Sequence, residues 1–271
     1  MEKKFKLGVI GAGFMSTAII SGALKSGFLP ENKIVVSDIN ENSFEKLKDY
    51  KINTTLSNSY VFENSEYVLF AIKPQNFKSV IEKEQFIPCN KFISIMAGVK
   101  KDYIKSVIGS KDISVARCMP NTPCSVGYGA VGLDVTDYSQ KSDIDFINGL
   151  FGCFSKVVFL DEDKLNAVTG ISGSSPAYFY LFAKCLIDAG VKNGLSEDAA
   201  KSLVVNTMIG SGKMLQLNND KSIDELIDAV CSKGGTTIEA IKSFKSDEIE
   251  AVVQRAVDAC VKRSGELESG L

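Results

Sequence analysis

Histidine is absent from the 271 residues of this chain. Its absence excludes histidine-dependent nucleophile systems, histidine general acids and bases, HExxH zinc helices and histidine-ligated haem. The sequence also lacks a CxxC pair, a basic run and any stretch of about 18 apolar residues that would span a membrane. We therefore expect no metal site, no nucleic-acid partner and no membrane partner.

The composition is that of an ordinary globular protein. Lys and Arg number 31 against 33 Asp and Glu, which gives a net charge of −2, and 45% of the residues are hydrophobic. Seven scattered cysteines, an odd number, are typical of a reducing compartment, and we expect most of them to be buried. Because no hydrophobic stretch of signal length precedes Gly8, we predict a cytoplasmic protein.

Apolar β-branched runs alternate with amphipathic stretches over the first 160 or so residues, which predicts βα units around a mostly parallel sheet. The predicted strands are Leu7–Ile10, Ile34–Ser37, Tyr67–Ile72, Phe92–Met96, Val115–Met119, Ala130–Leu133 and Val157–Leu160. After Asp161 only helical periodicity remains, including a helix that starts at Ser196 and a stripe from Ile249 to Val261.

The predicted fold class is therefore α/β: a Rossmann-type dinucleotide-binding domain over residues 1–161, followed by an all-α domain over residues 162–271. The helical part has broad apolar stripes and small residues such as Gly210 and Gly212. We expect it to dimerise, because one copy would leave apolar faces uncovered. The alternative is that the stripes pack on each other and on the sheet domain.

A glycine loop follows the first predicted strand and opens the helix Thr17–Lys25. Its spacing is Gly8-x-x-Gly11-x-Gly13-x-x-Ser16, with Phe14 and Met15 between. Gly11 permits the tight turn, Gly13 admits a pyrophosphate close to the backbone, and the N–H groups of the helix start attract phosphate. A second strand arrives within about 30 residues, as a dinucleotide-binding βαβ unit requires.

Asp38 ends the second strand about 20 residues beyond this loop, where an acid accepts hydrogen bonds from the ribose 2′-OH. The cofactor prediction is NADPH or NADH, with a slight preference for NADH from Asp38. A solvated turn acid is the alternative for Asp38, and Ser37 with a nearby cation would accommodate a 2′-phosphate.

Further cofactor candidates lie where later strands end, the edge at which open parallel sheets bind ligands. They are Ala71, Ile72, Lys73, Pro74, Ala97, Gly98 and Asn121. Ala97-Gly98 offers a close backbone approach. Asn121, in the proline-bracketed loop Pro120–Pro123, is the polar candidate for the nicotinamide end, with a simple Asx turn as the alternative.

Two segments of the helical half interrupt its apolar pattern. Gly170–Tyr178 is rich in small residues and restarts a helix at Pro176, a residue suited to a first helical turn. Ser232-Lys233-Gly234-Gly235-Thr236-Thr237 presents N–H groups and hydroxyls before another helix, which is typical of a site for a small carboxylate. A plain helix–helix connection is the alternative for each.

With these motifs the chain resembles the pyrroline-5-carboxylate reductase family over nearly its whole length. The matching segments are the glycine loop, Ala71–Pro74, Ala97–Val99, Arg117–Pro123, Gly170–Tyr178 and Ser232–Ile238. Phe14 and Ser16 replace the residues usual in the family's glycine loop, and Lys233 stands where the family normally has proline. Asp38 is uncommon in a family that often prefers NADPH.

The resemblance implies hydride transfer from a nicotinamide to the cyclic imine 1-pyrroline-5-carboxylate, giving L-proline, in a homodimer or ring of dimers. It makes Thr237 the catalytic residue, contacting the ring nitrogen. It assigns the substrate carboxylate to Ser232, Gly234, Gly235 and Thr236, and it adds Ser174 to the substrate group and Asn58 to the cofactor group.

Two other functions stay open from the sequence. One is a related imine or 3-hydroxyacid reductase. It is disfavoured because hydroxyacid reductases of this layout commonly use a lysine in the helical domain, and the segment from Ser172 has none before Lys184. The other is a non-catalytic NAD-binding regulatory protein that has kept the fold.

Overall fold

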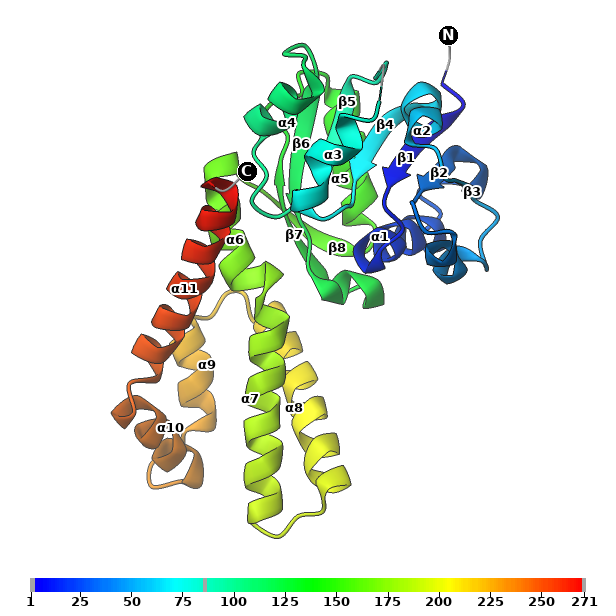
Figure 1. Cartoon of the computed structure of the whole chain (residues 1–271). Helices are drawn as coiled ribbons and strands as arrows, with labels where there is room; N and C mark the ends of the chain where they lie inside the picture. The colour runs from blue at the N-terminus through cyan, green and yellow to red at the C-terminus, as the bar shows by residue number, and fades with distance from the viewer. Residues whose placement is uncertain (1–2, 85–86, 270–271) are drawn as a thin grey trace. The chain divides into compact units, whose positions relative to one another are not determined.

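The computed structural model describes residues 3–84 and 87–269 (Figure 1). The chain divides into two compact units. The sheet unit runs to Pro176 and takes up the chain again from Ala259, and the helical unit is Ala177–Asp258. Among the described residues, no helix combines the length and the apolar character needed to cross a membrane.

An eight-stranded sheet forms the centre of the sheet unit, in the order β3-β2-β1-β4-β5-β6-β7-β8. The strands are β1 (Phe5–Ile10), β2 (Ile34–Ser37), β3 (Asn53–Thr55), β4 (Ser65–Phe70), β5 (Lys91–Ser94), β6 (Ser114–Met119), β7 (Gly129–Asp134) and β8 (Ser155–Phe159). Neighbouring strands pair parallel except β6 and β7. The predicted, mostly parallel α/β architecture is confirmed.

Strand β3 is absent from the predicted set, because its three residues, Asn53-Thr54-Thr55, carry no apolar signal. Its register is set by β2 alone, with Val35 opposite Asn53 and Ser37 opposite Thr55. An edge strand buries less surface than a central one, so it needs no run of β-branched apolar residues. Apolar periodicity therefore finds the central strands and overlooks this one.

Helices cover both faces of the sheet. The sheet-unit helices are α1 (Phe14–Lys25), α2 (Asn58–Asn64), α3 (Phe77–Ile81), α4 (Lys101–Ile108), α5 (Lys141–Gly152) and α6 (Leu165–Val168). One core layer joins α1 and α5, for example through Ile19 and Phe151, and the other joins α2, α3 and α4, for example through Phe62, Phe77 and Ile104. This doubly wound arrangement leaves the carboxyl ends of the strands open for a ligand.

After β8, every element in the part of the chain that the structure describes is helical. A 3₁₀ helix, Glu162–Lys164, precedes α6, and a π-helix, Thr169–Gly173, follows it. The remaining helices are α7 (Ser175–Lys192), α8 (Glu197–Leu217), α9 (Ile223–Val230), α10 (Thr236–Ser246) and α11 (Ile249–Ser269). Ser196 caps α8 by accepting from the Ala199 N–H, as the predicted start requires. A capping box between Ser222 and Glu225 begins α9.

The cysteines are all free, and three of the seven are buried. Cys89, Cys118 and Cys124, within the sheet unit, are buried. Cys185, on α7, is exposed, and the other three are half-buried. The expectation that most cysteines are buried is therefore wrong: Cys185 and Cys231 lie in the helical unit, which has almost no interior in a single copy, and Cys153 and Cys260 are only half-buried within the sheet unit.

Candidate active site

The glycine loop leaves β1 directly and turns back into α1. The Gly11 N–H donates to the Ser37 carbonyl at 2.8 Å, which ties the loop to the end of β2. Gly11 has a φ of +104°, and a Cβ there would lie 2.6 Å from the Ala71 carbonyl oxygen. Only glycine is free of strain at this position. The predicted role of Gly11 in the tight turn matches this geometry.

Gly13 differs from the other loop glycines because the protein itself does not require it. Its φ of −77° is open to any residue, and a Cβ would meet no atom within 4 Å. At Gly8, by contrast, a Cβ would lie 2.3 Å from the Ser65 Oγ, so that glycine serves the packing of β1. The free space at Gly13 is what a ligand approaching the backbone needs.

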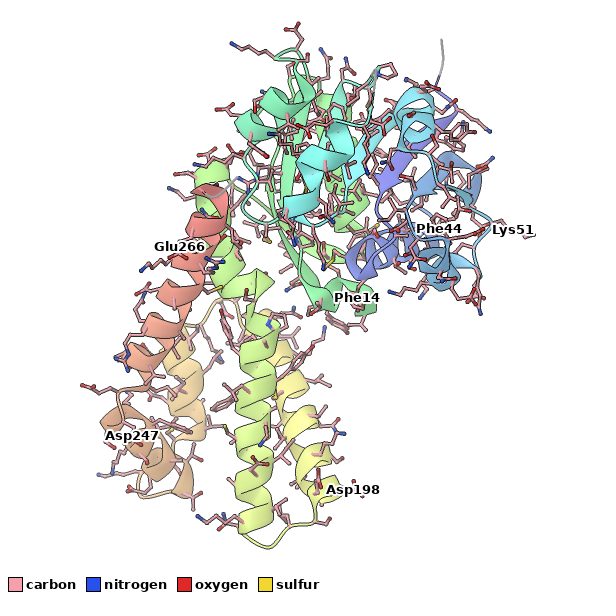
Figure 2. All side chains as sticks on the ribbon, viewed as in Figure 1. Phe14, Phe44, Lys51, Asp198, Asp247 and Glu266 are labelled. Carbon is pink, nitrogen blue, oxygen red and sulfur yellow. The ribbon has the colours of Figure 1, made fainter. Side chains whose placement is uncertain are left out.

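The N-terminus of α1 faces this free space. Gly13 is the N-cap residue, no side chain caps it, and no acidic residue occupies the first turn of this fully described helix. Unpaired N–H groups and the helix dipole make such an end attractive to an anion. Phe14 stands beside it, 55% exposed (Figure 2), whereas Ser16 is buried and donates to the Gly13 carbonyl.

The polar residues at the end of β2 contact the same loop. Asp38 accepts from the Ala12 N–H at 2.8 Å and from the Asn40 N–H at 2.9 Å. Ser37 is fully buried, and its hydroxyl donates to the Asn58 Oδ1 at 2.7 Å. Asp38 therefore lies at the surface of the loop, and Ser37 lies beneath Asn58.

A cleft of about 310 Å³ opens at the carboxyl ends of the strands. We call it the strand-end cleft; its lining residues are Met15, Ala71, Ile72, Lys73, Pro74, Ile95, Met96, Ala97 and Pro120. Six of the nine are predicted cofactor residues, and the structure brings them together. Ile95, Met96 and Pro120 were not among the predicted site residues, although Ile95 and Met96 end the predicted strand before Ala97 and Pro120 begins the loop that contains Asn121.

Gly98 and Asn121 are engaged by other parts of the protein. Gly98 has a φ of +69°, and a Cβ there would lie 3.2 Å from the Glu268 backbone nitrogen, on α11. Asn121 is buried; its Nδ2 donates to Ser172 at 3.3 Å and its Oδ1 accepts from the Ala130 N–H at 3.0 Å. Its amide therefore bridges the end of β6, the start of β7 and the π-helix.

The predicted substrate loop lies in the helical unit, between α9 and α10. Gly234 has a φ of +71°, and Gly235 is the N-cap of α10. The Gly235 N–H donates to the Ser232 carbonyl at 2.9 Å, so this N–H is already used within the turn. A Cβ on Gly235 would lie 2.3 Å from the Ser232 Oγ. Thr236 and Thr237 begin α10 and are exposed.

Ser174 lies elsewhere, at the end of the π-helix in the sheet unit. Its hydroxyl lies 3.3 Å from the Cys260 Sγ, on the part of α11 that belongs to the same unit. π-Helical turns are rare and frequently mark functional sites. The structure thus confirms that the segment from Gly170 departs from regular α-helix, and α7 begins at Ser175, one residue before the predicted restart.

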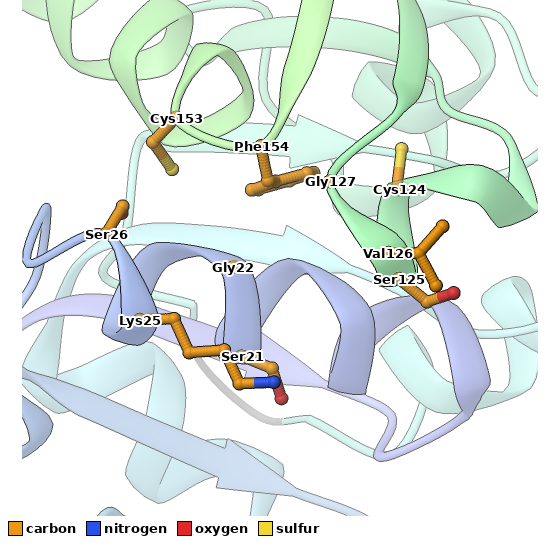
Figure 3. Close-up of a pocket in the computed structure, with 10 residues that line it drawn as sticks. All are labelled: Ser21, Gly22, Lys25, Ser26, Cys124, Ser125, Val126, Gly127, Cys153 and Phe154. Carbon is orange, nitrogen blue, oxygen red and sulfur yellow. The ribbon is translucent and has the colours of Figure 1, made fainter. Parts of the chain in front are cut away.

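A second cavity, of about 430 Å³, borders the C-terminal half of α1 (Figure 3). None of the predicted site residues lines it. Two of its lining residues, Cys124 and Cys153, have thiols whose pKa values are raised by burial. A raised pKa suppresses the thiolate form, so this cavity does not present a cysteine nucleophile.

The helical unit has almost no core within one copy. Within residues 177–258, all of which the structure describes, Ala200 is the only buried residue. Large apolar side chains are exposed on α7 and α8, among them Phe179 at 60%, Leu181 at 64% and Leu203 at 60%. An apolar surface of this extent marks a protein–protein interface.

A doubly wound sheet, a glycine loop with room beside the backbone and a cleft at the strand ends define a Rossmann-type NAD(P)-dependent oxidoreductase. A family model described as pyrroline-5-carboxylate reductase dimerisation matches residues 162–267. Another, described as NADP oxidoreductase coenzyme F420-dependent, matches residues 6–98.

Curated relatives include the pyrroline-5-carboxylate reductases of Pisum sativum and Haemophilus influenzae. The first is 35% identical over 269 residues, which cover 98% of this chain and 97% of that protein. The second is 35% identical over 263 residues, which cover 96% of each. The chain therefore belongs to the pyrroline-5-carboxylate reductase family.

Solved structures agree with this assignment. Plasmodium falciparum pyrroline carboxylate reductase with NADP bound superposes with a TM-score of 0.87 at 28% identity, covering 99% of this chain and 100% of that chain. A pyrroline-5-carboxylate reductase from Coxiella burnetii has a TM-score of 0.87 at 29% identity, covering 98% and 99%.

Proposed function

We propose that this protein reduces 1-pyrroline-5-carboxylate to L-proline with NAD(P)H, the last step of proline biosynthesis. The observation that carries the proposal is the open backbone at Gly13, where a Cβ would meet no protein atom within 4 Å. Family membership over nearly the whole chain supplies the substrate. The two observations are independent, because the first concerns space in this structure and the second concerns sequence.

The residues present fit a dinucleotide. The pyrophosphate would lie over Gly13, against the uncapped N-terminus of α1, and the nicotinamide end would enter the strand-end cleft. When bound, the reduced nicotinamide supplies the hydride. Ala71, Ile72 and Ala97 present small or apolar surface there, which limits water at the reacting atoms.

Within this proposal NADH is the preferred donor. Asp38 lies beside the glycine loop, and the segment 38–45 contains Asp38, Glu41 and Glu45 but no lysine or arginine. Two lysines follow this segment, Lys46 and Lys48, and Lys48 pairs with Glu45. Within residues 38–45 the only charged side chains that a 2′-phosphate would meet are therefore negative, whereas a 2′-hydroxyl would donate to Asp38.

For the substrate we assign Thr237 as the catalytic residue, with its hydroxyl on the ring nitrogen. The Thr236 N–H at the start of α10 and the Ser232 hydroxyl would hold the carboxylate, with Gly234 shaping the turn through its positive φ. Gly235 contributes by its lack of a side chain, since its N–H already bonds to Ser232. Ser174 is the further polar residue that we place in the substrate group.

We assign the assembly as a homodimer or a ring of dimers formed through the helical unit. The exposed apolar side chains of α7 and α8 support this assignment. Sedimentation velocity on serial dilutions tests it: we expect dimers or larger species to persist, with no active monomer. A monomer that turns over at the full rate would contradict an assembly needed for activity.

Dinucleotide oxidation by the purified full chain tests the reaction. We expect NADH and NADPH oxidation that depends on 1-pyrroline-5-carboxylate, with L-proline as the product. A 3-hydroxyacid offered with NAD⁺ serves as the control for a 3-hydroxyacid dehydrogenase, and the readout is then the formation of NADH. Dinucleotide binding without turnover of either substrate would favour a non-catalytic protein of this fold instead.

A further inference from the structure

The last two turns of α11, drawn in red in Figure 1, pack within the sheet unit on the turn that follows β5. A Cβ on Gly98 would lie 3.2 Å from the Leu267 Cβ, 3.2 Å from the Glu268 nitrogen and 3.3 Å from the Ser264 carbonyl oxygen. The close backbone approach at Gly98 is thus made by α11. Glycine suits this position for two reasons: its φ of +69° lies in the left-handed region, and α11 packs closely against it.

Ion pairs also connect α11 to β6 and to the residues that follow Gly98. Arg117, on β6, is only 2% exposed, and its Nη1 lies 3.0 Å from the Glu162 Oε1 and 3.7 Å from the Glu268 Oε1. The Glu268 Oε2 lies 3.4 Å from the Lys100 Nζ and accepts from the Asn166 Nδ2 at 3.2 Å. A buried arginine needs such partners, because an unpaired buried charge is strongly destabilising.

Glu162, one of these charged groups, also binds the residue that ends the turn, Lys101. The Lys101 backbone N–H donates to the Glu162 Oε1 at 2.8 Å, the atom that also binds Arg117. Ser264 is buried, and its hydroxyl donates to the Asn166 Oδ1 at 2.7 Å. The segment from Gly98 to Lys101 is therefore held by α11 on one side and by Glu162 on the other.

Both anchored segments lead directly to the strand-end cleft. Ala97, which lines the cleft, immediately precedes Gly98, and Pro120, which also lines it, follows Arg117 by three residues. Ala97 also packs against Met119, Leu165 and Val168. A shift of α11 away from Gly98 would therefore move a wall of the cleft.

We propose that Glu268 and Arg117 are positioning residues that clamp the Ala97–Gly98 turn and so set the wall of the cofactor cleft. Neither residue lines the cleft, and each acts through the turn. The proposal rests on the proposed function in one respect, that the strand-end cleft receives the nicotinamide end of NAD(P)H. It predicts that a change on the C-terminal helix alters dinucleotide affinity.

The test compares Glu268→Gln with Glu266→Gln in the full chain. Both remove one carboxylate from α11, but Glu266, labelled in Figure 2, pairs with Arg263 at the surface, where its side chain is 47% exposed. We expect Glu268→Gln to raise the Kd of NADH about three- to tenfold, measured by titration below the unfolding temperature. Glu266→Gln should stay within about twofold of wild type.

Glu268→Asp keeps the charge and should recover part of the lost affinity. If Glu268→Gln is poorly folded, Lys100→Gln weakens the same clamp at a residue that is exposed, and we expect a smaller loss in the same direction. A lowered unfolding temperature with unchanged dinucleotide Kd would overturn the proposal, because it would make the clamp a purely structural contact. An equal loss in Glu266→Gln would overturn it as well.

Binding and turnover separate this inference from the proposed function. The Kd comparison decides the clamp even if the wild-type chain reduces no cyclic imine. Turnover of 1-pyrroline-5-carboxylate with unchanged affinity in Glu268→Gln would leave the proposed function standing and remove the clamp.

Discussion

The Asp38 carboxylate accepts a hydrogen bond from the Ala12 N–H at 2.8 Å, which joins the end of β2 to the glycine loop. The residue proposed to select the dinucleotide is thereby held against the loop proposed to bind its pyrophosphate. The second carboxylate oxygen accepts from Asn40, so the acid is oriented from both sides before any ligand arrives. Pre-organised groups bind at a lower entropic cost than mobile ones.

Replacing Asp38 with serine should move the donor preference toward NADPH. Removing the carboxylate abolishes its repulsion of a 2′-phosphate and weakens its hold on a 2′-hydroxyl. We expect the ratio of kcat/KM for NADH over NADPH to fall by about tenfold or more, a difference of about 1.4 kcal/mol. Steady-state kinetics with both donors measures it, and Glu41→Gln controls for general loop charge. A wild-type preference for NADPH would contradict the role of Asp38.

Alanine at Gly13 and at Gly11 should separate ligand space from backbone strain. At Gly13 the new methyl group meets no protein atom, so stability should be unchanged or higher by up to about 1 kcal/mol while dinucleotide affinity falls. At Gly11 a methyl group would be strained by the φ of +104° and would clash with the Ala71 carbonyl. We expect Gly11→Ala to lower the free energy of unfolding by about 2 kcal/mol or more. Thermal unfolding with dinucleotide titration distinguishes the two. Unchanged affinity in Gly13→Ala would contradict the proposed pyrophosphate position.

Thr237→Ala should lower kcat and kcat/KM together, because a hydrogen bond that strengthens as the ring nitrogen becomes an amine acts in the transition state. Thr237→Ser keeps the hydroxyl and should restore most of the rate. Since Thr237 is exposed at the start of α10, stability should change little. A wild-type kcat in Thr237→Ala would remove this residue from the mechanism.

Gly235→Val should act mainly through the KM for the imine. A Cβ at this position would lie 2.3 Å from the Ser232 Oγ, so the larger side chain displaces a group proposed to hold the carboxylate. Contacts made equally in the ground and transition states affect KM rather than kcat. The NADH Kd, measured on the same variant, should be unchanged. A comparable loss of dinucleotide affinity would show that the loop is misassigned.

Acid should weaken the fold through Asp143, a buried carboxylate at the start of α5. Burial opposes its ionisation, but hydrogen bonds from Lys91, at 2.7 Å, and from Tyr67 lower the pKa of Asp143 below its usual value. A lowered folded pKa means that this stability is present above the unfolded pKa of about 3.9 and is lost as the pH falls through the folded value.

Asp143→Asn should therefore reduce the free energy of unfolding at pH 7, by about 2 kcal/mol or more, and by less near pH 3. Urea denaturation at the two pH values measures the difference. Asp163→Asn, at an exposed ion pair with Lys164, is the matched control and should change little at either pH. If Asp143→Asn lowers the free energy of unfolding equally at both pH values, the lowered pKa of Asp143 does not contribute to stability as proposed.

The local sequence pattern was sufficient to predict the central strands, the start of α8 and the glycine loop. Each depends on residues close together in the chain, such as the β-branched run of β2 or the Ser196 cap. The residues that line the strand-end cleft were also found largely from sequence, because strand ends of a parallel sheet share one edge. β3 was missed because an edge strand needs little apolar surface.

Sequence by itself determined the chain's family, the change from alternating strands and helices to helices alone, and the chemistry that its motifs favour, because these depend on composition and short spacing. The tertiary structure decided which glycine has room for a ligand, that Gly98 lies under α11 and that Asn121 bridges Ser172 and Ala130. Those contacts join segments far apart in the chain. Since a glycine has the same letter whether a ligand, a helix or a strained turn requires it, only the atoms around it reveal the reason.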